Sequence, residues 1–197
     1  IKIDGESFKF DKNNSILIAN NARTILSEKN IELIADQLIY DQKVSIIKAF
    51  GNVEINDLLN EIKFKSEEVI YNKNKGAIVS NTKSFFTDRP GNNFIAEQFI
   101  YTFDDNLIKI FKSKITDIKD NVYHIENAFL NPITNKLIGK DILIDFNSLA
   151  ENNEPRMAGK TISSDKDKTI IEKGVFTTCK RNDDCPPWEF LAKKITH

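Results

Sequence analysis

The chain has 197 residues, and its 28 basic and 29 acidic side chains leave a formal net charge of −1 at pH 7. Such a chain has no net positive field to hold a nucleic-acid backbone, so no nucleic-acid partner is expected. With 40% hydrophobic and 29% charged residues, the composition is that of a globular domain and not of a disordered tail. No apolar run approaches the roughly 20 residues that a membrane-spanning helix needs, and no signal peptide is visible at the start of the chain.

Strand-favouring side chains dominate the apolar residues, with fourteen Phe beside one Trp and one Met. Apolar and polar residues alternate at period two in segments such as 31–35, 61–65 and 107–111, which is typical of half-buried strands. Clusters of turn-forming residues separate such segments, at 11–14, 72–76, 88–92, 104–106 and 131–132. The sequence therefore predicts an all-β fold of antiparallel strands.

A repeat of about 30 residues runs along most of the chain. Its template is two alternating apolar positions, a small residue, an apolar residue three positions later and a second apolar or aromatic residue. The small positions are Gly5, Ala35, Ser66, Ala96 and Asn127, and a further copy contains Gly139. A period of this size indicates stacked supersecondary units.

The three-residue step after the small residue breaks the alternation, so each strand must bend or bulge there. Stacking such strands predicts a bent antiparallel β-jellyroll, or V-shaped sandwich, with a long apolar interior. In any sandwich such residues mostly pack against each other, so the repeat predicts the architecture more strongly than it predicts a ligand. The positions chosen as inward-facing are Phe8, Phe10, Leu33, Leu38, Phe64, Val69, Phe94, Phe99, Ile125 and Ile142.

Two parts of the chain resemble a known family. Residues 34–41, Ile-Ala-Asp-Gln-Leu-Ile-Tyr-Asp, and 49–55, Ala-Phe-Gly-Asn-Val-Glu-Ile, resemble the OstA/LptA repeat of bacterial lipopolysaccharide transport. Residues 174–179, Gly-Val-Phe-Thr-Thr-Cys, and 185–197, which begin Cys-Pro-Pro-Trp, resemble the region of LptD proteins that precedes their outer-membrane barrel.

The resemblance implies an OstA-like β-jellyroll over residues 1–172. It also implies a Cys-containing connector and last strand over 173–197 that lead to a barrel absent from this sequence. The chain would be the periplasmic domain of a Gram-negative outer-membrane protein, without enzymatic activity. Its partners would be lipopolysaccharide, an LptA-like bridge protein and, through the barrel, an LptE-like lipoprotein.

Three states of Cys179 and Cys185 stay open: a local disulfide, disulfides to the barrel, as the resemblance suggests, or two free thiols. Zinc is not expected, because Cys-x5-Cys is not a usual ligand spacing and only His124 and His197 could assist. Trp188 follows two prolines and is expected to anchor the last strand.

Catalysis finds no support in the sequence. The two histidines lie far apart, no Ser or Cys stands in a recognisable nucleophile motif, and the seven glycines form no phosphate-binding loop. Acidic residues alternate with apolar ones, as on the solvated face of a strand. No cofactor and no metal are therefore expected.

Acyl chains cost about 0.8 kcal/mol per CH₂ when exposed to water, so a lipid carrier needs an apolar trough. The ten inward-facing positions would line it. The first strand, with Ile1, Ile3 and Phe8, is the predicted edge for a partner that adds a strand to the sheet. Two alternatives are a soluble carrier like LptA or LptC and, with less support, a carbohydrate-processing β-solenoid enzyme.

Overall fold

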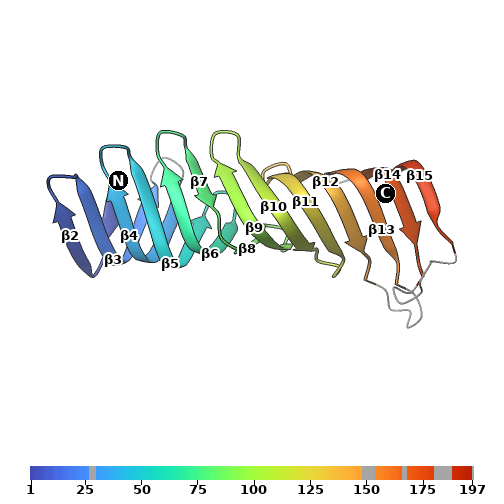
Figure 1. Cartoon of the computed structure of the whole chain (residues 1–197), viewed down its shortest axis with the longest axis horizontal. Coiled ribbons are helices and arrows are strands. Elements are labelled where there is room, and N and C mark those ends of the chain that lie inside the picture. Colours follow the sequence, from blue (N-terminus) through green and yellow to red (C-terminus); the bar gives the residue numbers. More distant parts are fainter. Residues whose placement is uncertain (27–29, 148–153, 166–167, 180–187, 197) are drawn as a thin grey trace.

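The computed structural model describes residues 1–26, 30–147, 154–165, 168–179 and 188–196. Within these ranges fifteen strands form one antiparallel sheet and no helix is present, so the prediction of an all-β fold is confirmed. Consequently nothing in these ranges could cross a membrane as a helix. Figure 1 shows the strands stacked side by side along the long axis of an elongated molecule, with the N- and C-terminal strands at opposite ends.

Most neighbours in the sheet are also neighbours in sequence. Along the sheet the order is β1-β3-β4-β5-β6-β7-β9-β10-β11-β12-β13-β14-β15, while β2 pairs with β3, and β8 pairs with β6 and β9. The strands are β1 (Lys2–Asp4), β2 (Ser7–Asp11), β3 (Ile16–Leu26), β4 (Ile31–Asp41), β5 (Ile46–Asp57), β6 (Ile62–Asn72), β7 (Ala77–Ser80), β8 (Ser84–Thr87), β9 (Asn93–Thr102), β10 (Leu107–Thr116), β11 (Val122–Asn131), β12 (Lys136–Asp145), β13 (Arg156–Ser164), β14 (Thr169–Thr177) and β15 (Phe190–Thr196).

The long strands bend near their midpoints, as the three-residue step predicts. In β9, Ala96 and Phe99 are buried, whereas the two residues between them are exposed. The ladders between β4 and β5 and between β5 and β6 shift register at the same level of the sheet. Residues with left-handed φ stand at the bends of alternate strands, and they are Asn21, Asn52, Lys112, Asp141 and Lys173.

The bend folds the sheet into two layers that face each other. Layer A holds β2, β7 and the strand halves 16–20, 37–41, 46–50, 68–72, 98–102, 107–111, 128–131, 136–140, 161–164 and 169–172. Layer B holds β1, β8 and the halves 22–26, 31–35, 53–57, 62–65, 93–96, 113–116, 122–125, 142–145, 156–159 and 174–177. The open side opposite the bend, where the turns of both layers lie, is called the mouth below.

Turns of one kind connect consecutive strands in both layers. Asp11 Oδ1 accepts hydrogen bonds from the backbone N–H groups of Asn13 and Asn14, at 2.9 and 3.1 Å. An Asx side chain that accepts from the backbone in this way stabilises a tight turn. Equivalent side chains accept from backbone N–H groups at Asp41, Asp57, Asn72, Asp88, Asp117, Asn131 and Asp165.

The core lies between the layers and forms one continuous cluster along the molecule. Ala35, Ala96 and Gly139 occupy small inward positions at the bends, as the repeat predicts. The prediction for Asn127 is wrong: this side chain is exposed and Ala128 takes the inward position.

The boundary predicted between residues 172 and 173 falls within β14, and the pairing of β14 with β13 and β15 continues on both sides of it.

Candidate functional site

Eight of the ten residues predicted to face inward are buried between the layers. They belong to the continuous core and pack against other apolar side chains of both layers. These eight residues are Leu33, Leu38, Phe64, Val69, Phe94, Phe99, Ile125 and Ile142. Their contact with a lipid remains a prediction.

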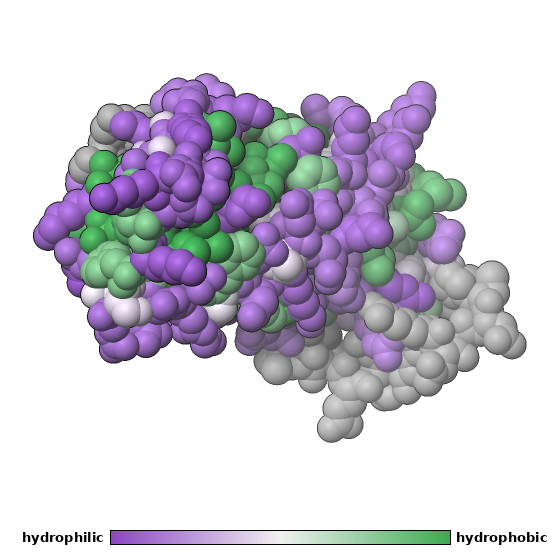
Figure 2. Space-filling view, turned by 60° about the vertical axis from the view of Figure 1, so that its left-hand side comes forward, coloured by the Kyte–Doolittle hydropathy of each residue, from purple (hydrophilic) through white to green (hydrophobic). Residues whose placement is uncertain are grey.

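Phe8 and Phe10 are instead 53% and 48% exposed. Phe8 pairs with Ala19 and Phe10 with Leu17, so both phenyl rings lie on the face that carries the buried Ala19. They are uncovered because β2 lies at the edge of the sheet. Figure 2 brings this N-terminal end forward and shows hydrophobic surface on it.

The predicted partner edge is formed by β1 and β2 together. Ile1 is exposed, whereas Ile3 is half-buried against the core and pairs with Thr24. Among the described strands, β1 and β2 pair only with β3. One side of each is therefore open to a further strand.

Aromatic rings fill the interior between β6 and β9. The ring centroids of Phe64 in layer B and Phe99 in layer A are 4.9 Å apart, so the stack joins the two layers. Phe86 and Phe94 stack at 4.3 Å. We call the whole set the aromatic cluster, which consists of Phe64, Tyr71, Phe86, Phe94, Phe99, Tyr101 and Phe103.

A polar clasp bridges the mouth beside the aromatic cluster. The Tyr101 hydroxyl of layer A donates to Asp57 Oδ2 in a layer B turn. Asn60 Nδ2, from that same turn, donates to the Tyr101 hydroxyl at 2.9 Å and to Asp57 Oδ2 at 2.8 Å. Tyr101 and Asp57 are only 1% and 3% exposed. Burial and the neighbouring Asp57 carboxylate raise the pKa of Tyr101 far above its usual value, so the hydroxyl keeps its proton and remains a donor.

On the C-terminal side of the clasp, a crevice of about 320 Å³ opens between the layers. Such a volume is at the lower end of the range for ligand pockets. Its walls are apolar side chains of both layers, Phe94, Ile115, Leu130, Leu137 and Ile162. Polar groups surround its opening, among them Asp88, Asp117, Tyr123, Asn135 and Asp165.

Of these crevice residues, only Phe94 was singled out from the sequence. Tyr123 and Leu137 stand in the copies of the repeat that contain Asn127 and Gly139, and this is the one signal that could have pointed to them. Leu130 and Ile162 lie in segments that the repeat does not align. The position of the crevice depends on how the two layers meet, which the spacing within one strand does not describe.

Two aspartates at the crevice opening differ in their electrostatics. Asp88 Oδ1 accepts from the N–H of Asn92 at 2.8 Å, and Asp117 Oδ1 accepts from the N–H of Asn121 at 2.9 Å. Burial raises the pKa of Asp88, and its hydrogen bonds offset this only in part. At Asp117 burial also acts to raise the pKa, but the hydrogen bonds, those from Asn121 foremost, outweigh it and lower the pKa overall.

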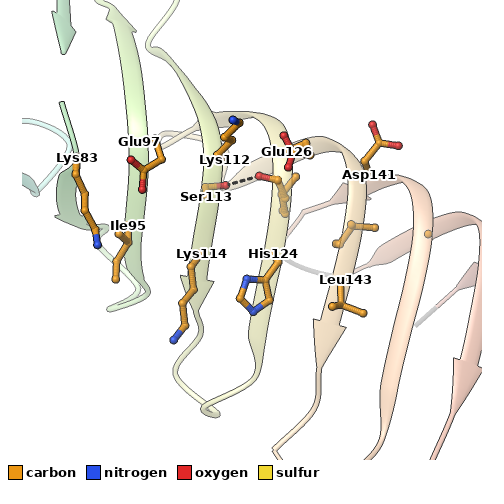
Figure 3. Close-up of a pocket in the computed structure, with 13 residues that line it drawn as sticks. Lys83, Ile95, Glu97, Lys112, Ser113, Lys114, His124, Glu126, Asp141 and Leu143 are labelled. Atoms are coloured by element: carbon orange, nitrogen blue, oxygen red, sulfur yellow. Dashed lines mark hydrogen bonds between the residues drawn. The ribbon is translucent and has the colours of Figure 1, made fainter. Parts of the chain in front are cut away.

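A second hollow, of about 810 Å³, lies at the bend on the outside of β9–β12. Figure 3 shows charged side chains of both signs around it, with Lys112 near Glu126, and Lys114 beside His124. This mixture fits the solvated strand face predicted for the acidic residues. In the part of the chain that the structure covers, no group of three His, Cys, Asp or Glu side chains could hold a metal ion.

At the C-terminal end Cys179 is buried, and its Sγ lies 4.0 Å from the carbonyl oxygen of Trp188. Cys185 lies outside the described residues, so a disulfide between them remains a prediction. The Trp188 carbonyl accepts a hydrogen bond from Thr177 Oγ1 at 2.9 Å, and the ring centroid lies 6.1 Å from that of Phe176. These contacts join β14 to the start of β15.

No protein-family model and no curated protein matches the chain. Among solved structures, the chain is similar to LptH from Pseudomonas aeruginosa, described as the LptA homologous periplasmic component of the conserved lipopolysaccharide transport device. The TM-score is 0.47 at 17% sequence identity, over 53% of this chain and 78% of LptH. A likeness this distant supports no conclusion about function.

Proposed function

We propose that the chain binds lipid acyl chains between its two layers and acts, without catalysis, in lipopolysaccharide transport in the periplasm. The observation that carries this proposal is the crevice, whose apolar walls belong to both layers and lead into the continuous core. Burying an acyl chain there would offset the cost of about 0.8 kcal/mol per exposed CH₂. The open mouth would leave the anionic head group of the lipid in water.

The interior is filled with side chains, so a whole acyl chain fits only when the layers move apart. Across the mouth, the layers are held by apolar packing and by the clasp of Asp57, Asn60 and Tyr101. Apolar packing is not directional, so lipid tails can replace side-chain contacts of the core at small net cost. The two layers would then surround the acyl chains, and the distance between the layers would adjust to the bound chains.

Within this function, we propose the role of the N-terminal periplasmic domain of LptD. The support is the segment at 174–179 and 185–197, together with the OstA/LptA-like repeat before it. An LptA-like bridge protein would dock at the edge formed by β1 and β2 and deliver lipopolysaccharide. A barrel with its LptE-like lipoprotein would receive it. A soluble carrier like LptA or LptC is the second candidate, and the coding sequence downstream of His197 distinguishes the two.

The test is photocrosslinking in cells that make lipopolysaccharide. A photoreactive phenylalanine replaces Phe64 or Phe99, which face the interior, and in control proteins Phe85 or Phe129, which face outward. We expect lipopolysaccharide adducts from the two interior positions and none from the outward ones. Adducts confined to the outward positions, or absent from all four in folded protein, would contradict the proposal.

A further inference from the structure

The clasp holds the two layers together at one point of the mouth. Asp57 and Asn60 lie in a layer B turn, whereas Tyr101 lies on β9 in layer A, 41 residues from Asn60 in sequence. By contrast, the Tyr123 hydroxyl donates at 3.1 Å to Asp117, and both residues belong to layer B. Two tyrosine–aspartate pairs are therefore present near the mouth, the first buried and the second half-buried, and only the first links the layers.

The clasp and the crevice are neighbours along the mouth. A hollow of about 470 Å³ between the turns is lined by Asn60 of the clasp and by Asn135 of the crevice opening. The aromatic cluster fills the interior directly behind the clasp, and Phe94 belongs to both this cluster and the crevice wall. Clasp and cluster together thus stand at the N-terminal limit of the crevice.

The interior on the C-terminal side has smaller side chains. Gly139 and Gly159 stand at the bends of β12 and β13, where aliphatic side chains of neighbouring strands occupy the space that a Cβ would need. The crevice walls there are mainly Ile and Leu, which have no hydroxyl to bond across the mouth. At the crevice walls the layers meet through apolar packing, whereas at the clasp a buried carboxylate would lose its donors when the layers separate.

We propose that the crevice is a port through which an acyl chain passes between the interior and the mouth, and that the clasp with the aromatic cluster is a gate between this port and the N-terminal half. This inference rests on the proposed function and adds the place of binding and the barrier to movement. The ligand class is a saturated acyl chain of a lipid. Opening the gate requires the Tyr101 hydroxyl to leave Asp57 and Asn60.

The experiment uses purified protein of the full chain and palmitate that carries a photoreactive diazirine near its tail. After irradiation, mass spectrometry locates the labelled residues. We expect labelling of the crevice walls, Leu137 and Ile162. We expect little labelling of Leu33 and Leu38, which are buried on β4, on the N-terminal side of every strand that carries a gate residue.

Two matched variants test the gate. Tyr101→Phe keeps the ring and removes the hydroxyl that joins the layers, so labelling of Leu33 and Leu38 should rise on the order of tenfold, as expected for one lost hydrogen bond to a charged group. Tyr40→Phe makes the same chemical change on β4, outside the clasp, the aromatic cluster and the crevice, and should leave that labelling unchanged. Leu137→Trp fills the crevice and should abolish labelling of Ile162.

The outcomes separate the two proposals. Equal labelling of both halves in the unmodified protein, or no response to Tyr101→Phe in a variant that keeps its melting temperature, overturns the gate. Persistent labelling of Ile162 in Leu137→Trp overturns the port. No labelling of any interior residue, with unaltered folding, rejects acyl-chain binding itself and thus the proposed function.

Discussion

Glycines at the bends make room for isoleucines of the neighbouring strands. A Cβ on Gly139 would lie 2.8 Å from Cγ2 of Ile125, and one on Gly159 would collide with Cγ2 of Ile171. The φ angles of both glycines lie outside the left-handed region, so these positions are governed by space and not by backbone freedom.

We therefore predict that Gly159→Ala destabilises the protein by about 1–3 kcal/mol through overpacking. Ile171→Ala alone should also destabilise it, because it leaves a cavity. In the double variant the new methyl group occupies part of that cavity, so its loss should be smaller than the sum of the two single losses. Urea unfolding of the four proteins measures this coupling, and additive losses would contradict the packing argument.

At the scale of single residues, the sequence predicted which apolar residues are buried better than it predicted which of them are exposed. Alternation identified Leu33, Phe64 and Phe99 as inward-facing, because in a strand the side-chain direction follows from position alone. It could not predict the exposure of Phe8 and Phe10, since exposure depends on whether another strand covers the face. It also did not indicate the Asp57–Tyr101 hydrogen bond, which joins two residues 44 positions apart.

At the scale of single elements, the equivalent turns at Asp88 and Asp117 allow an experiment on how stability depends on pH. Asp88 and Asp117 accept similar backbone hydrogen bonds, yet the pKa of Asp88 is raised and that of Asp117 is lowered. A raised carboxyl pKa means that ionisation disfavours the folded state, so stability at this site is lost as pH rises through the folded pKa. A lowered pKa means that ionisation favours the folded state, so this stabilisation is lost as pH falls through the folded pKa.

At pH 7 we therefore expect Asp117→Asn to lower the free energy of unfolding by about 1 kcal/mol. Asp88→Asn keeps an acceptor oxygen and removes the buried charge, so it should be neutral or slightly stabilising. Asp88→Asn should approach the unmodified protein below about pH 4, near the usual carboxyl pKa. Asp117→Asn should do so only at still lower pH, below the lowered pKa of Asp117. Urea unfolding at several pH values tests this, and equal effects of the two variants at pH 7 would refute the assigned pKa directions.

The strands and turns were largely predictable from the sequence, because alternation and Asx-rich turns are local signals. The segment 78–86 shows what local signals miss. It alternates like one strand, yet it divides into β7 and β8. The hydroxyls of Ser66, Ser80 and Ser84 bond to one another there at 2.9–3.2 Å, in a cluster that two separate strands have to assemble.

At the scale of the whole molecule, the N-terminal end has uncovered apolar surface on the interior face. Phe8 and Phe10 lie on that face of β2 without a strand beyond them. A partner whose sheet continued the fold would cover both rings and pair with the free edge. The interior of such a complex would run from the partner into this domain without crossing water.

We predict that the double variant Phe8→Lys and Phe10→Lys weakens binding to an LptA-like partner on the order of tenfold or more, as expected when a buried apolar anchor is lost. These two residues suit the test better than Ile3, because Ile3 also packs against the core. Phe129→Lys, on an exposed outer face, is the matched control. Equal affinity of all three proteins in calorimetry would reject this end as the docking edge.

The sheet does not close on itself, and this has a consequence for distance. The thirteen strands on the main path of the described sheet, at about 4.8 Å per strand, give a length of roughly 60 Å along the stacking direction. Each further hairpin would add about 10 Å without altering the cross-section. Duplication or deletion of single hairpins could thus adjust the length of such a domain to the distance between the partners that it connects.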